Sequence, residues 1–67
     1  MNEITVNGEK RLVAEGTCLA ELVSELDLPD TRIAVELNKD VVRRKSWDKT
    51  RLSKDDVIEV IHFVGGG

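Results

Sequence analysis

The chain has 67 residues, of which 40% are hydrophobic and 34% charged, and its formal net charge is −3. This composition is that of one small globular domain, and the acidic balance argues against a general nucleic-acid binder. A single cysteine excludes a disulfide framework and a four-cysteine metal site within the chain. Because no apolar run approaches the ~18 residues of a membrane span and no signal peptide is recognisable, we expect a cytoplasmic protein without a membrane partner.

The first residues predict a β-hairpin. Asn7 and Gly8 stand between two short segments that suit strands, over residues 2–6 and 9–14, and this dipeptide is typical of a two-residue hairpin turn. Such a turn pairs Val6 with Glu9 and Ile4 with Arg11. In that register Val13 faces the core and Leu12 faces the other way.

The next segment predicts one helix. Thr17, after Gly16, is the expected N-cap. One apolar stripe suited to packing on a sheet follows at helical spacing: Leu19, Leu22, Val23 and Leu26. We expect the helix to end at Leu28, because the residue before a proline is pushed out of the α region.

The second half of the chain predicts further strands. Residues 33–37 alternate, a turn at 38–40 leads to a short strand at 41–42, and one helical turn is expected near Trp47. Residues 57–64 form the longest apolar, β-branched run, so we expect this strand to be central and to lie beside the first strand.

This order of elements predicts an α+β fold of the β-grasp type. We expect a mixed sheet of four to five strands with one main helix on one face. The domain would cover residues 1–64 and leave a flexible glycine tail at residues 65–67.

The sheet face away from the helix is the expected partner surface. Alternation along the last strand directs Ile58 and Val60 toward the helix and leaves Ile61 and Phe63 on the opposite face, where Leu12 also belongs. One helix cannot cover both faces of a sheet, and exposed apolar patches usually mark interaction sites.

Charge is unevenly distributed along the chain. Residues 39–54 hold seven of the ten basic residues and have a local net charge of +5, which leaves −8 for the remainder. Two interpretations stay open: a solvated loop, or a surface that steers an acidic protein partner.

No enzyme active site is recognisable in the sequence. The single histidine, His62, lies within a strand, and no nucleophile motif accompanies it. We expect Cys18, at the helix start, to be structural. The remaining reactive group is the terminal carboxylate of Gly67, which a separate ATP-using enzyme must activate before it can transfer anything.

Several segments, in this order, resemble the ThiS family of ubiquitin-like sulfur carriers in thiamine biosynthesis. They are Val6-Asn7-Gly8-Glu9, Glu15-Gly16-Thr17 before Leu19-Ala20-Glu21-Leu22, Val35-Glu36-Leu37-Asn38, Val41-Val42 with Trp47 further on, and Asp56-Val57-Ile58-Glu59-Val60 leading to Val64-Gly65-Gly66-Gly67.

The resemblance implies a carrier that is itself no enzyme and binds no cofactor or metal. A ThiF-type enzyme would consume ATP to adenylate the Gly67 carboxylate, and a sulfur donor of the cysteine desulfurase type would convert it to a thiocarboxylate. Thiazole synthase (ThiG) would then take the sulfur into the thiazole ring. Gly66 and Gly67 would be the functional pair, with Gly65 extending the tail.

Three alternatives remain beside this interpretation. The chain could be a MoaD-like small subunit of molybdopterin synthase, a ubiquitin-like modifier conjugated to lysines, or a β-grasp binding module whose glycines are incidental. The partners, rather than the tail itself, distinguish the first two from a thiamine sulfur carrier.

Overall fold

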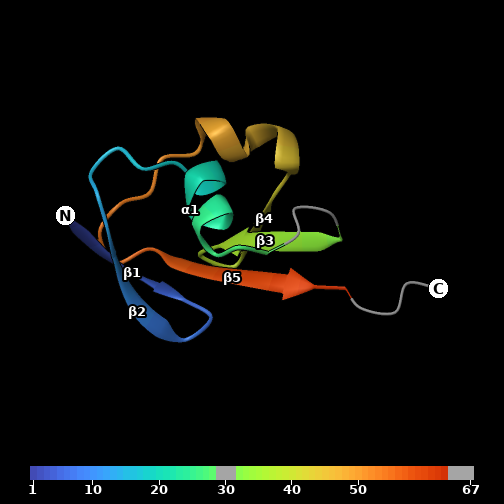
Figure 1. Cartoon of the computed structure of the whole chain (residues 1–67), viewed down its shortest axis with the longest axis horizontal. Helices are drawn as coiled ribbons and strands as arrows, with labels where there is room; N and C mark the ends of the chain where they lie inside the picture. Colours follow the sequence, from blue (N-terminus) through green and yellow to red (C-terminus); the bar gives the residue numbers. More distant parts are fainter. Residues whose placement is uncertain (29–31, 64–67) are drawn as a thin grey trace.

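The computed structural model describes residues 1–28 and 32–63. Its elements are β1 (Asn2–Val6), β2 (Glu9–Val13), helix α1 (Leu19–Glu25), β3 (Ile33–Leu37), β4 (Asp40–Val42), the 3-10 helix η1 (Arg44–Lys49) and β5 (Val57–His62). The strands form one sheet in the order β2-β1-β5-β3-β4, in which β1 and β5 are parallel and the other pairs antiparallel. The predicted mixed sheet with one main helix is therefore confirmed (Figure 1). The predicted domain boundary at residue 64 lies outside the described residues and stays a prediction.

The β1–β2 hairpin has the predicted register. Asn7 and Gly8 have φ angles of 49° and 84°, the left-handed geometry that matches a two-residue turn to the twist of its strands. Val6 pairs with Glu9, and Leu12 pairs with Glu3 on the outward face. The turn dipeptide was thus sufficient to fix which side chains of the hairpin enter the core.

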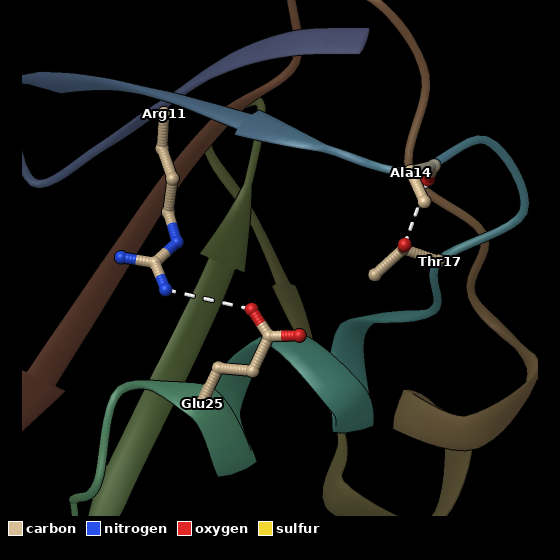
Figure 2. A network of polar contacts seen from close by, with 4 residues as sticks. All are labelled: Arg11, Ala14, Thr17 and Glu25. Carbon is tan, nitrogen blue, oxygen red and sulfur yellow. Dashed lines mark hydrogen bonds and ion pairs between the residues drawn. The ribbon is translucent and has the colours of Figure 1, made fainter. Parts of the chain in front are cut away.

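The start of α1 differs from the prediction by one residue. Cys18, not Thr17, is the N-cap, and its backbone N–H donates to the Glu21 carboxylate at 2.9 Å. The Cys18 side chain faces the backbone N–H of Glu21, which completes a capping box, although sulfur is a weak acceptor. The Thr17 hydroxyl instead donates backward to the Ala14 carbonyl at 2.7 Å, closing the loop after β2 (Figure 2).

The end of α1 also comes earlier than predicted. The helix stops at Glu25, with Leu26 as C-cap and Asp27 at a left-handed φ of 56°, so the chain leaves the helix before Leu28. The Arg11 guanidinium on β2 lies 3.4 Å from the Glu25 carboxylate at the end of α1. Figure 2 shows the two side chains directed toward one another. Because both side chains are substantially exposed, this ion pair contributes little to stability.

The core lies between the sheet and the two helices, which cover the same face (Figure 1). The side chains of the core cluster are aliphatic except for Trp47, whose indole N–H donates to the Val42 carbonyl at 2.9 Å. The members are Ile4, Val6, Val13, Leu19, Leu22, Val23, Ile33, Val35, Trp47, Leu52 and Ile58. No described element covers the opposite face of the sheet.

Candidate functional site

The strand that precedes the glycine tail is the central strand of the sheet. β5 lies between β1 and β3, and Ile58 is fully buried in the core. Val60 is partly buried against the same core. The predicted position of this strand and the inward direction of both side chains are confirmed. Gly65, Gly66 and Gly67 lie outside the described residues.

The hairpin tip holds β5 through a side chain. The backbone N–H of Asn7 donates to the Ile58 carbonyl at 2.9 Å, and its side-chain Oδ1 accepts from the Val60 N–H at 2.8 Å. Since β1 ends at Val6, the amide oxygen stands where a longer parallel strand would place its next carbonyl. Asn7 therefore extends the β1–β5 pairing by one hydrogen bond.

A second asparagine holds the start of β5. Asn38 Oδ1 accepts from the Val57 N–H at 2.9 Å, and Asn38 Nδ2 donates to Asp56 Oδ1 at 3.0 Å. The other carboxylate oxygen of Asp56 accepts from the Ser53 N–H at 2.7 Å. Asn38 has a positive φ of 52°, as Asn7 does, and the sequence indicated both residues only as turn formers. The signal that could have indicated these contacts is the asparagine at each turn, because an asparagine side chain can accept a hydrogen bond in place of a backbone carbonyl.

Three side chains named as the partner surface are exposed on the face away from α1. The exposed fractions are 43% for Ile61, 55% for Phe63 and 61% for Leu12. Their exposure agrees with the predicted alternation, while their role as a partner surface stays a prediction.

The register separates Leu12 from the other two. Leu12 pairs with Glu3, two residues before the Thr5–Val57 pair, whereas Phe63 lies six residues after that pair. Eight residues of strand span about 26 Å. Ile61 and Phe63 thus lie together at the end of β5 that leads to the tail, and Leu12 lies at the far end of the same face.

The other candidate side chains are not assembled into a reactive cluster. Cys18 is buried at the helix start, where its backbone bridges to Arg51, and His62 is exposed on β5. Within residues 1–28 and 32–63, no group of histidine, cysteine and acidic side chains could hold a metal ion. None of the helices in this part of the chain is long and apolar enough to cross a membrane.

The basic segment at residues 39–54 contributes to local structure. The Arg44 guanidinium lies 5.0 Å from the centre of the Trp47 ring, and Arg51 donates to the Gly16 carbonyl at 2.8 Å. A groove of about 570 Å³ runs between α1 and η1, and its lining includes Arg44 together with Asp27 and Asp48. Because the groove carries both signs of charge, it favours neither interpretation of the segment.

Comparison with known proteins gives the family. The model of the ThiS family matches residues 2–67. The chain belongs to the ThiS family. A crystal structure of the ThiS thiamine biosynthesis protein from Geobacter metallireducens is similar, with a TM-score of 0.82 and 37% identity over 97% of this chain and 99% of that chain. The sulfur carrier protein ThiS of Bacillus subtilis is 35% identical over 49 residues, which are 73% of this chain and 74% of that protein.

Longer proteins also contain a ThiS-like stretch. A thiazole synthase from Magnetococcus marinus is 43% identical over 65 residues, which are 97% of this chain. The chain spans only about one fifth of the length of that protein and of a second thiazole synthase, from Paramagnetospirillum magneticum, that is 29% identical.

Proposed function

We propose that the chain carries sulfur for thiamine biosynthesis as a thiocarboxylate on Gly67. The observation that carries this proposal is the central position of β5, which ends three residues before the first of the three terminal glycines in the sequence. β5 is central, Ile58 is fully buried, and Asn7 and Asn38 each accept a hydrogen bond from its backbone. Family membership and the likeness to a sulfur carrier support the same chemistry.

The proposed reaction begins with activation of an unreactive group. An α-carboxylate with a pKa of about 3.3–3.7 is ionised at neutral pH and resists nucleophiles. In the adenylating enzyme, an oxygen of the Gly67 carboxylate attacks the α-phosphorus of ATP, and pyrophosphate leaves. The resulting acyl adenylate has AMP as a good leaving group.

Sulfur then replaces the leaving group. A persulfide from a cysteine desulfurase type of donor attacks the acyl carbon and expels AMP, and a thiol reduces the acyl disulfide to release the thiocarboxylate. The net change replaces one carboxylate oxygen with sulfur. Glycines suit these steps because they present no side chain to a narrow channel or to the attacking nucleophile.

The proposed acceptor of the sulfur is thiazole synthase. Support comes from proteins named thiazole synthase that contain a stretch similar to this chain. A polypeptide that combines a ThiS-like segment with a thiazole synthase is consistent with a sulfur carrier and a synthase that interact.

Intact mass spectrometry tests the proposal. The chain is incubated with ATP, a ThiF-type enzyme, a cysteine desulfurase, cysteine and a thiol reductant. We expect the mass increase of sulfur replacing oxygen, dependent on ATP, in the parent chain and not in Gly66→Val, whose side chain obstructs a close-fitting channel. An unchanged mass of the parent chain contradicts the proposal, and attachment to lysines of other proteins would favour the modifier alternative.

A further inference from the structure

The end of β5 extends beyond its neighbour β1. The last backbone pair between the two strands is Val6 with Ile58, and the Asn7 side chain takes the Val60 N–H. On its other side, β5 continues beside β3 as far as the pair of His62 with Ile33. Figure 1 shows β3 and β5 running on past the tip of the β1–β2 hairpin.

The hydrogen bonds show which backbone groups this leaves open. Odd-numbered residues of β5 direct their groups to β3, as in the bond from the Phe63 N–H to the Arg32 carbonyl at 2.8 Å. Even-numbered residues face β1, as in the bond from the Asn7 N–H to the Ile58 carbonyl. The Val60 carbonyl and the N–H and carbonyl of His62 therefore point to the side where β1 has ended, and they have no hydrogen-bond partner among the described residues.

Within residues 1–28 and 32–63, these three groups form a short open sheet edge. The Val60 carbonyl and the His62 carbonyl are acceptors, and the His62 N–H between them is a donor. Because the backbone is extended here, another strand can pair with these groups. On the face away from α1, Ile61 and Phe63 flank the edge and are about half exposed. A strand added here would gain backbone hydrogen bonds and could pack apolar side chains beside these two residues.

We propose that an extended segment of the adenylating enzyme adds to this edge as a strand beside residues 60–62. This inference rests on the proposed function, because it assigns the open edge to the enzyme that activates Gly67. The edge is followed directly by the part of the chain that ends in the three glycines. Pairing there would fix the direction in which the tail enters the enzyme.

A second copy of the chain is the less suitable occupant. Two β5 edges paired antiparallel around Ile61 would form only two hydrogen bonds between residues 60 and 62 of each copy. A contact of this length falls far short of the ~1,000 Å² that a specific interface needs. The adenylating enzyme would instead bind the tail as well and so add contact area beyond the edge.

Two substitutions at one position test the backbone contact. His62→Pro removes an N–H for which the described part of the chain offers no acceptor, and it places the proline ring where the added strand would lie. His62→Thr removes the imidazole and keeps the N–H, in a residue that suits strands. We expect the Kd for a ThiF-type enzyme to rise at least about tenfold for His62→Pro and by less than about twofold for His62→Thr. Equal binding of the parent chain and a folded His62→Pro variant would overturn the proposal.

Amide hydrogen exchange on the parent chain gives a second test that needs no variant. The His62 N–H should exchange rapidly in the free chain and at least about tenfold more slowly in the complex. No slowing on binding overturns the proposal, as does slowing that depends only on the concentration of the chain itself. Protection of His62 without thiocarboxylate formation contradicts the proposed function alone. Thiocarboxylate formation with His62 unprotected in the complex overturns the edge proposal alone.

Discussion

The side-chain oxygen of Asn7 accepts a hydrogen bond at 2.8 Å from the backbone N–H of Val60, which lies 53 residues further along the chain. This bond joins the tip of the first hairpin to the strand that precedes the glycine tail. It also marks the point at which β5 loses its neighbour on that side. The same asparagine therefore extends the pairing of β5 and bounds the open edge beyond it.

Two substitutions of Asn7 separate the contribution of this hydrogen bond to stability from the contribution of the turn conformation. Asn7→Gly keeps a residue suited to the φ of 49° but removes the acceptor, whereas Asn7→Asp keeps both. We expect Asn7→Gly to lower the free energy of unfolding by about 1 kcal/mol and Asn7→Asp to change it little. Urea unfolding measures the effect, and faster amide exchange at Val60 in the glycine variant assigns it to this bond. Parent-like exchange at Val60 in Asn7→Gly would show that the bond has no role.

Replacing the N-cap cysteine should stabilise the chain without affecting sulfur transfer. Serine at position 18 supplies an oxygen acceptor for the capping box in which Glu21 already accepts the Cys18 N–H. We expect Cys18→Ser to raise the free energy of unfolding by up to ~1 kcal/mol, measured by urea unfolding. The variant should still form the thiocarboxylate, and a folded Cys18→Ser chain that cannot do so would place Cys18 in the chemistry.

The same capping box predicts a pH dependence of stability. The hydrogen bond from the Cys18 backbone lowers the pKa of Glu21 below its usual range, with a smaller contribution from the Cys18 side chain. A lowered pKa in the folded state gives stabilisation that is present above the unfolded pKa of about 4.3 and is lost as the pH falls through the folded value. As the pH falls over this range, the Tm of the parent chain should therefore decrease more steeply than the Tm of Glu21→Gln, whose side-chain amide does not titrate there. Parallel Tm profiles of the two chains would exclude this contribution.

The apolar residues at the tail end of β5 should matter for activation more than for folding. Phe63 is 55% exposed on the face away from α1, so Phe63→Asp should fold with little loss of stability. We expect at least a tenfold loss, about 1.4 kcal/mol, in kcat/KM for thiocarboxylate formation. Leu12→Asp is the matched variant at the far end of the same face and should cause a smaller loss. An equal loss in both variants would mean that the partner covers the whole face.

Much of the fold follows from local sequence signals. The Asn7–Gly8 turn determines the register of the hairpin, and the apolar run at residues 57–64 indicates a central strand. The predicted N-cap, Thr17, is wrong by one residue, because Thr17 and Cys18 are both residues that can precede a helix. The actual cap depends on the Glu21 carboxylate and on the loop bond between Thr17 and Ala14.

The features that the sequence could not supply depend on contacts between distant segments. The bonds from Asn7 and Asn38 to β5 exist only because the folded sheet brings residues far apart in sequence together. The separation of Leu12 from Phe63 requires the register between β1 and β5, which alternation within each strand does not contain. The open edge likewise follows from where β1 ends relative to β5, a relation between two strands.

Locating the transferred sulfur tests the central claim most directly. After reaction with ATP, the adenylating enzyme, the sulfur donor and a thiol reductant, the chain is cleaved and its fragments are sequenced by tandem mass spectrometry. Our account predicts that sulfur replaces oxygen only in fragments that contain Gly67, and only when ATP is present. Sulfur bound to Cys18, or a Gly67 fragment of unchanged mass, would contradict it.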